Sequence, residues 1–189
     1  LDTASDGENA WPYRKDLVSQ TITYLAPDVL GMQEVLLGQK RDLEADLPGY
    51  AFAGVARDDG ASKGEFSPLA WKRARWTALE SGTFWLSPTP GVPSKGWDAA
   101  LPRIATWALL QDRGTGELVR VLNTHFDHVG EEARQESAAQ IAAGSALSDD
   151  DLVRLGTSLT HPQVRDTLYA LAVGDGAGPA ESLWADLSR

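Results

Sequence analysis

Short β-type runs between residues 68 and 124 constrain the fold of this chain more than any other feature. They are rich in aromatic and β-branched residues and are separated by Gly, Pro and Asp, the pattern of strands joined by turns. Helical periodicity stands before and after them, so the order of elements predicts an α/β domain in which helices cover sheets. The expected strands are 28–35, 50–55, 68–72, 83–86, 104–111 and 118–124, and the expected helices are 11–26, 37–47 and 131–143, with a polar loop over 57–64 and a hairpin turn over 112–116.

The composition narrows the function without choosing one. The chain carries 17 Lys and Arg against 27 Asp and Glu, a formal net charge of −10. Such a charge repels a polyphosphate backbone at long range, so non-specific nucleic-acid binding is not expected. The absence of cysteine excludes disulfides, a thiol nucleophile and a zinc–thiolate site. No apolar run approaches the roughly 20 residues of a membrane helix and no signal segment is visible, which leaves a soluble protein, cytoplasmic or secreted.

Polar residues gather where the last expected strand ends. Val121–His128 read VLNTHFDH, an apolar run that finishes in histidine and carboxylate, and two of the three histidines of the chain fall there. Enzymes of the α/β class place their chemistry at such ends, because the strand fixes each side chain against the core while its tip meets solvent. A second apolar run ends in Gln33 and Glu34. These strand ends are the leading candidate site.

Six sequence blocks in a fixed order point to a family. They are Asp6–Trp11, Gly31–Val35, Gly64–Pro68, Ser81–Ser87, Pro102–Arg103 and Asn123–His128. Together they resemble the endonuclease/exonuclease/phosphatase family, which includes pancreatic deoxyribonuclease, sphingomyelinases and inositol polyphosphate 5-phosphatases. The resemblance implies a four-layer α/β/β/α sandwich, two packed mixed β-sheets flanked by helices. It also implies hydrolysis of phosphoesters with a divalent metal, usually Mg²⁺, with Mn²⁺ as the alternative.

The resemblance assigns roles at the strand ends. Glu34 matches the metal-ligand glutamate of the family, and a strand-tip carboxylate is the hard oxygen ligand that Mg²⁺ prefers; the alternative is a solvated glutamate. His125 matches the histidine that hydrogen-bonds the scissile phosphate, although a lone histidine in an apolar strand is often a satisfied core residue. Arg103 matches a basic residue at the active-site end of the sheet, with an exposed arginine paired to Asp98 as the alternative.

Three further residues are expected to contact substrate. Ser67 lies, with Glu65, where relatives bring a polar loop to the pocket, and Asp127 with His128 indicates that the last strand ends in solvent. The seven tryptophans are expected to pack in the core rather than to form a base-stacking platform.

Three motifs of the family are missing: the asparagine that ends its first strand, a Gly-Asp-Phe-Asn strand, and an Asp-His pair near the C-terminus. The substitutes are poor. Ser148–Asp151 has the pattern of an N-capped helix start, Gly174–Gly176 that of a turn, and His161 has no aspartate before it. Residues 159–169 resemble the segment that follows the missing Gly-Asp-Phe-Asn strand. The chain therefore looks truncated or internally deleted.

Two hypotheses follow. The first is a metal-dependent hydrolase of a small phosphoester, phospholipid headgroup or nucleotide, with the missing groups outside the chain or not recognised. The second is a degenerate, catalytically inactive homologue that acts as a binding or scaffold module. Both assume a single domain over residues 1–189, with the family likeness clear over about 2–143 and divergent over 144–189. An incomplete fold also predicts reduced stability.

Overall fold

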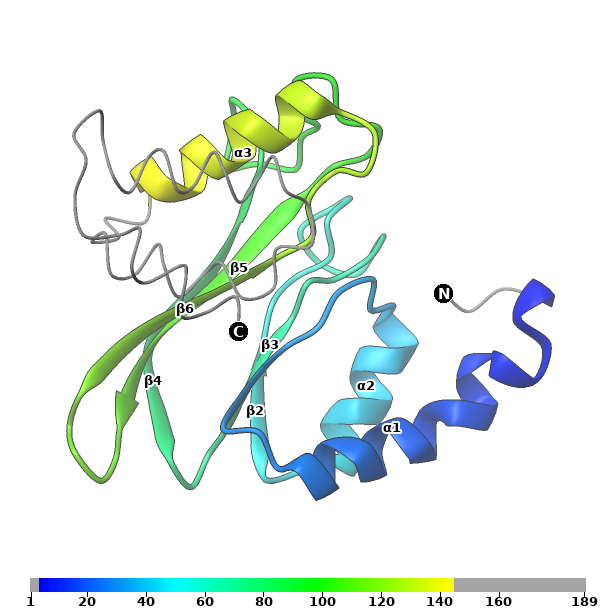
Figure 1. The fold of residues 1–189 in the computed structure, drawn as a ribbon, viewed down its shortest axis with the longest axis vertical. Coiled ribbons are helices and arrows are strands. Elements are labelled where there is room, and N and C mark those ends of the chain that lie inside the picture. The colour runs from blue at the N-terminus through cyan, green and yellow to red at the C-terminus, as the bar shows by residue number, and fades with distance from the viewer. Residues whose placement is uncertain (1–3, 145–189) are drawn as a thin grey trace, which may run out of the picture.

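The computed structural model describes residues 4–144, and the expectations for 148–151, 159–169, His161 and 174–176 lie outside this range. The predicted order of helices and strands is confirmed over the described residues (Figure 1). The elements are η1 (Ala4–Asn9), α1 (Trp11–Leu25), β1 (Val29–Gly31), α2 (Leu37–Asp46), β2 (Tyr50–Ala53), β3 (Leu69–Lys72), β4 (Trp76–Trp85), β5 (Ile104–Asp112), β6 (Leu118–Thr124) and α3 (Glu131–Gly144).

The strands form two three-stranded sheets, with the orders β1-β3-β2 and β4-β5-β6. Every ladder between the described strands is antiparallel, so the expectation of mixed sheets is wrong for this part of the chain. The reason is local for the second sheet, because β4, β5 and β6 follow one another and pair as neighbours, which reverses the direction at each step.

The inner faces of the two sheets share one apolar core. Leu69 and Trp71 of β3 pack with Ala108 and Leu110 of β5. These residues are two apart within each strand, and side chains two apart lie on the same face of a sheet. The sheets therefore lie face to face, with the main core between them.

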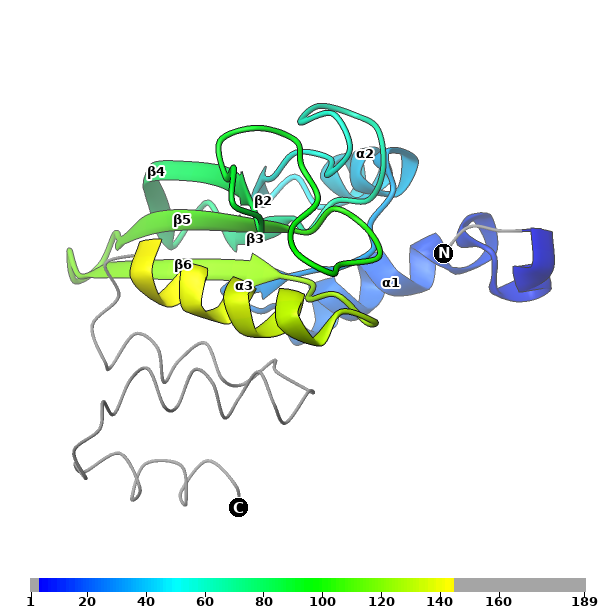
Figure 2. The ribbon, with the colours of Figure 1, turned by 90° about the horizontal axis from the view of Figure 1, so that it is seen from above.

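Helices cover the outer faces. Ala70, on the opposite face of β3, contacts a cluster from α1, α2 and the segment that follows α2. Ala105 of β5 packs against Ile141 of α3, so α3 covers the second sheet (Figure 2). The two sheets thus lie between α1 and α2 on one side and α3 on the other. The cluster under Ala70 consists of Trp11, Leu43, Leu47 and Tyr50.

Two strands differ in length from their predictions. β1 has three residues instead of the eight expected over 28–35, because the backbone bulges away from its neighbour after the hydrogen bond from the Met32 N–H to the Pro68 carbonyl and pairs with it again at a bridge from Val35 to Phe66. β4 begins at Trp76 rather than at Thr83. Its middle residues are exposed, so they lack the apolar alternation by which a strand is recognised.

The hairpin between β5 and β6 is confirmed. The Asp112 carboxylate accepts hydrogen bonds from the backbone N–H of Gly114 at 2.7 Å and of Thr115 at 3.1 Å. Gly116 has a φ of 77°, which a glycine adopts without steric cost. Acceptance of backbone N–H groups by an aspartate side chain at the start of a turn is a common way to stabilise it, and it adds a physical reason for the predicted hairpin.

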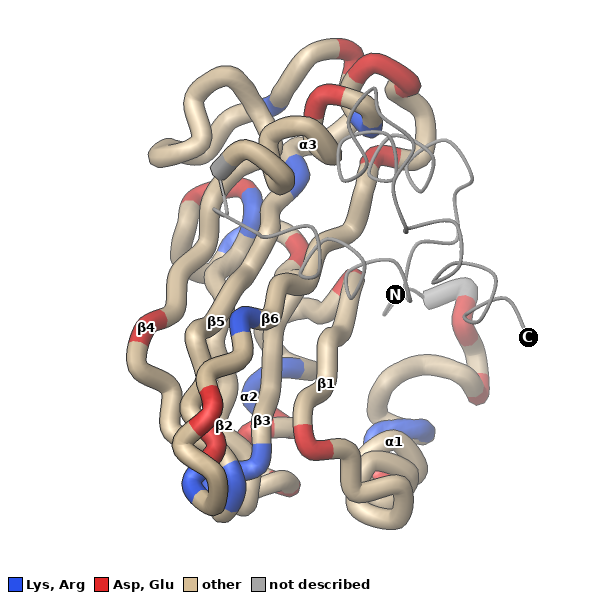
Figure 3. The backbone as a smooth tube through the Cα atoms, turned by 60° about the vertical axis from the view of Figure 1, so that its left-hand side comes forward, with Lys and Arg blue, Asp and Glu red and all other residues tan. Residues whose placement is uncertain are grey.

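Charges of both signs are interspersed along the described backbone (Figure 3). At the β1 start, Asp28 forms ion pairs with Lys72 and Arg75, and Arg75 also pairs with Asp112. Of the helices in the described range, none combines the length and the apolar character that crossing a membrane requires.

Candidate functional site

Glu34 lies on a bulge at the end of β1. Gly31 pairs with Leu69 and Val35 bridges Phe66, so three residues on the first segment lie opposite two on the second. An extra residue of this kind bends the strand and turns a side chain in a new direction. Glu34 itself has a φ of 57°, a left-handed conformation that is costly for a residue with a Cβ atom. Such strain persists only where the surrounding structure holds it, and it is common at functional sites.

The bulge brings Glu34 to His125, which follows the end of β6. The Nε2 atom of His125 lies 3.1 Å from Oε1 of Glu34, although the two residues are 91 positions apart. Their side chains are 31% and 47% exposed, respectively. The hydrogen bond from His125 lowers the pKa of Glu34 below its ordinary value, and this effect exceeds the opposing effect of burial. The structure therefore joins an ionised, half-exposed carboxylate to an imidazole at the meeting point of the two sheets.

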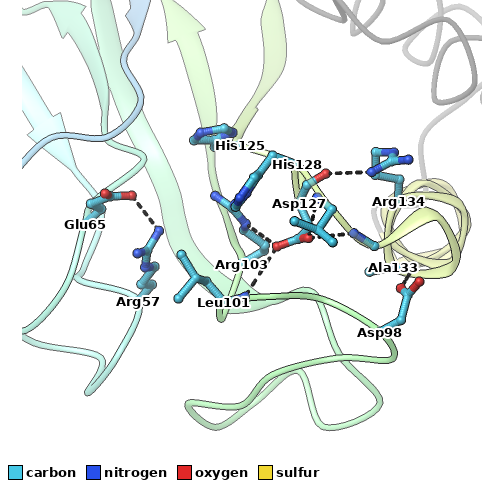
Figure 4. A network of polar contacts seen from close by, with 12 residues as sticks. Arg57, Glu65, Asp98, Leu101, Arg103, His125, Asp127, His128, Ala133 and Arg134 are labelled. Carbon is cyan, nitrogen blue, oxygen red and sulfur yellow. Dashed lines mark hydrogen bonds and ion pairs between the residues drawn. The ribbon is translucent and has the colours of Figure 1, made fainter. Parts of the chain in front are cut away.

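Arg103 lies immediately before β5 and is buried in an ion pair. Its Nε donates to Oδ2 of Asp127 at 3.1 Å, and the two side chains are 5% and 1% exposed. The alternative of an exposed arginine paired with Asp98 is wrong. The Asp98 carboxylate instead accepts from the backbone N–H of Ala133 at 2.7 Å, where α3 begins (Figure 4).

Asp127 organises the turn from β6 to α3. Its Oδ1 accepts from the backbone N–H of Val129 at 3.0 Å and of Gly130 at 2.8 Å. Burial alone would raise the pKa of Asp127. The hydrogen bonds from the amides of Gly130 and Val129, together with Arg103, outweigh this effect, so the pKa of Asp127 lies well below its usual range. Both carboxylate oxygens are thus bound to internal donors, and a direct contact with substrate would require Asp127 to leave them.

The guanidinium of Arg103 also forms a hydrogen bond with His128. The Nη2 of Arg103 lies 2.9 Å from Nδ1 of His128. Guanidinium nitrogens only donate, so Nδ1 must accept, and the neutral ring carries its proton on Nε2. His128 is exposed and lies beside His125 and Arg103 (Figure 4). The tautomer fixed by Arg103 thus leaves one N–H donor on the solvent side of the strand end.

Ser67 and Glu65 lie on the segment that leads into β3. Ser67 is 4% exposed, so its predicted contact with substrate remains a prediction. Glu65 forms an ion pair with Arg57 at 2.5 Å. The carbonyl of Arg57 accepts from the indole N–H of Trp85 at 2.6 Å, which anchors the loop that carries this pair.

The sequence prediction missed Asn123, which belongs to the last motif but was given no role. It is 7% exposed and lies on the inner face of β6, in phase with Val119 and Val121. A signal was present, because an amide two residues after an inward-facing valine must find hydrogen-bond partners in the interior. Its partners lie in the β1 bulge and in the segment opposite it, just before β3.

The residues at hand fit a divalent metal in part. In residues 4–144 there is no group of three or more His, Cys, Asp or Glu side chains that could hold an ion. Glu34 offers one hard, ionised oxygen ligand beside His125. Because Mg²⁺ keeps several waters and is usually held by one or two carboxylates plus substrate phosphate, Glu34 suits an anchoring ligand rather than a complete cage.

Comparisons with known proteins bear on this site. An endonuclease/exonuclease/phosphatase from Bacteroides vulgatus is 49% identical, with a TM-score of 0.75 over 76% of this chain and 56% of that chain. A mannosyl-6-phosphatase from Bacteroides thetaiotaomicron is 35% identical, with a TM-score of 0.76 over 89% of this chain and 66% of that chain. An uncharacterized protein of Acanthamoeba polyphaga mimivirus is 26% identical over 84% of this chain and 63% of its own length. Residues 88–189 match the model of a domain of unknown function (DUF4192).

The chain belongs to the endonuclease/exonuclease/phosphatase family, as its sequence motifs predicted, and its residues 88–189 belong as well to the domain of unknown function that they match. It spans 56% of the Bacteroides vulgatus protein and 63% of the viral one, so it corresponds to part of these relatives.

Proposed function

We propose that the protein is a hydrolase of phosphoesters that depends on Mg²⁺ or Mn²⁺, built on the four-layer sandwich that the family resemblance implies. The observation that carries the proposal is the contact between Glu34 and His125 at 3.1 Å. These residues match the metal-ligand glutamate and the phosphate-binding histidine of the family. Family membership supports phosphoester chemistry, and Glu34 is a half-exposed carboxylate at the strand end, the kind of oxygen ligand that Mg²⁺ prefers.

Each residue of the strand ends has a distinct role in this proposal. Glu34 would hold the cation, and a bound cation would supply positive charge to neutralise the phosphoryl oxygens. Once Glu34 holds the cation, the Nε2 N–H of His125, which faces Glu34 in this structure, would donate to a non-bridging oxygen, and the outward N–H of His128 is a second donor to substrate. Arg103 positions His128 and adds positive charge, and Asp127 holds Arg103 in place.

Hydrolysis also needs a base that activates water, a step worth typically 10²–10⁴-fold in rate. The site carboxylates in the described part of the chain are committed elsewhere: Glu34 to the metal, Asp127 to Arg103 and Glu65 to Arg57. We therefore assign the base to none of these three carboxylates.

A small phosphomonoester is the substrate to test first. The relative named a mannosyl-6-phosphatase is 35% identical to this chain, which favours a sugar phosphate. A phospholipid headgroup and a nucleotide are the other members of the small-phosphoester class. The net charge of −10 disfavours a long nucleic acid.

A second candidate is a catalytically inactive homologue that binds phosphoesters without turning them over. It is favoured by the finding that residues 4–144 hold no three-ligand metal group. The two candidates differ in turnover, not in the ability to bind a phosphate.

The test is hydrolysis of mannose 6-phosphate, p-nitrophenyl phosphate and bis-p-nitrophenyl phosphate by the full chain with Mg²⁺ or Mn²⁺. We expect turnover that is abolished by EDTA and by His125→Ala, and retained in Tyr50→Phe. The Tyr50 hydroxyl donates to the Pro27 carbonyl at 2.7 Å, so this control loses a hydrogen bond away from the site. Phosphate binding without turnover would favour the inactive homologue, and loss of both would contradict the proposal.

A further inference from the structure

The side chain of Asn123 connects the β1 bulge to β6 through hydrogen bonds. The Nδ2 of Asn123 donates to the carbonyl of Met32 at 2.7 Å and to the carbonyl of Pro68 at 3.0 Å. Its Oδ1 accepts from Nε2 of Gln33 at 2.5 Å. Asn123 therefore bonds both the bulge and the segment opposite it, and it does so from the other sheet.

The chemistry of these partners selects an asparagine. Two carbonyl oxygens must meet a group with two N–H donors, while the Gln33 amide N–H must meet an acceptor, and only a carboxamide supplies both at this length. An aspartate would place its charge against two carbonyl oxygens. The fit is also steric, because a Cβ atom on Gly31 would lie 2.8 Å from Oδ1 of Asn123.

The hydrogen bonds of Asn123 lie directly beside the candidate site. Glu34 follows Gln33, and His125 comes two residues after Asn123, so both members of the contact adjoin residues of the same hydrogen-bond set. The backbone bonds of the bulge belong to the first sheet alone: Met32 N–H to the Pro68 carbonyl at 3.0 Å and Val35 N–H to the Phe66 carbonyl at 3.2 Å. They hold the shape of the bulge without relating it to β6.

We propose that Asn123 is the positioning residue of the site: by tying the β1 bulge to β6 it holds Glu34 in its left-handed conformation within reach of His125. The geometric part stands on the contacts above, and the consequence for metal binding rests on the proposed function. A bulge held only by its own sheet would keep its shape without Asn123, and this difference can be measured.

The experiment compares Asn123→Ser with Thr124→Val in the full chain. Thr124 is a matched control, since its hydroxyl donates to the Ile104 carbonyl at 2.7 Å, a partner in the second sheet rather than in the bulge. Amide hydrogen exchange is followed by NMR at Met32 and Val35, with Trp107 of β5 as internal reference. Mn²⁺ affinity is measured on the same samples. Gln33→Ala, which removes one bond from an exposed side chain, serves where Asn123→Ser does not fold.

We expect exchange at Met32 and Val35 to rise by about tenfold or more in Asn123→Ser, since the hydrogen bonds from the Asn123 carboxamide to the bulge are lost. Exchange at Trp107 should change by less than about threefold, and Thr124→Val should leave the bulge amides unchanged. In Gln33→Ala the same amides should exchange faster by about threefold. Equal acceleration at all three amides, or none at the bulge, would overturn the positioning role.

The Mn²⁺ affinity measurements distinguish a failure of this inference from a failure of the proposed function. A Mn²⁺ dissociation constant raised about tenfold in Asn123→Ser, and unchanged in Thr124→Val, would support both. A wild-type protein that does not bind Mn²⁺ would count against the metal role of Glu34. The exchange data would still decide whether Asn123 holds the bulge.

Discussion

Removing one partner of the Arg103–Asp127 ion pair should be far more costly than removing a surface pair. Both side chains are at least nine-tenths buried, and breaking such a pair typically costs 3–5 kcal/mol because an uncompensated charge stays inside. Arg103→Met leaves Asp127 with the Val129 and Gly130 amides, so we expect the lower end, about 3 kcal/mol. Asp127→Ala also removes the acceptor for those amides and leaves a buried guanidinium, so we expect about 5 kcal/mol.

Urea unfolding followed by circular dichroism measures these costs. The double variant should be less destabilised than the sum of the two single variants, by roughly 2 kcal/mol, because neither charge then remains buried alone. Glu44→Gln is the control: its pair with Lys40 is a surface pair within α2, so its loss should cost less than about 0.5 kcal/mol. Single variants that cost under about 1 kcal/mol, or strictly additive costs, would refute the reasoning.

The same pair predicts how stability depends on pH. The pKa of Asp127 is lower in the folded protein than the ordinary value of 3.8, so the unfolded chain binds the proton first as the pH falls. The stabilisation is therefore complete above pH about 4 and is lost progressively below it. Asp127→Ala should remove this part of the acid sensitivity, and an unchanged acid limb in that variant would contradict the account.

Three further substitutions have definite expectations. Gly31→Ala should cost about 1–3 kcal/mol in urea unfolding, because its Cβ would lie 2.8 Å from the Asn123 side chain and force it aside. Glu34→Gly should change the free energy of unfolding by less than about 0.5 kcal/mol, because relief of the left-handed conformation offsets the entropic cost of glycine and the lost hydrogen bond to His125; a loss above about 1.5 kcal/mol would contradict this. Leu110→Ala should cost about 2–5 kcal/mol in thermal or urea unfolding, since Leu110 is fully buried between the sheets.

Most helices and strands could be predicted from local sequence patterns. The strands at 104–111 and 118–124 and the helices at 11–26 and 131–143 were placed to within two residues, since apolar alternation and turn residues mark them. The meeting of Glu34 with His125 was also foreseeable, because family motifs stand at both strand ends.

The features missed by the sequence prediction depend on contacts between distant segments. Nothing local marks Glu34 as left-handed, because the bulge exists only relative to the register of β1 on β3. The burial of Arg103 follows from its partner Asp127, which is 24 residues away, whereas the sequence left an active-site arginine and an exposed arginine paired with Asp98 as alternatives. The role of Asn123 likewise required knowing which carbonyls lie opposite the inner face of β6.

The most direct test of the central claim is calorimetric titration of the full chain with Mn²⁺ in wild type, Glu34→Gln and Glu44→Gln. The account predicts that the wild type binds Mn²⁺ and that Glu44→Gln binds it with the same affinity. In Glu34→Gln the affinity should fall by at least about tenfold, because a neutral amide oxygen replaces a charged carboxylate ligand. No binding in the wild type, or binding unaltered in Glu34→Gln, would contradict it.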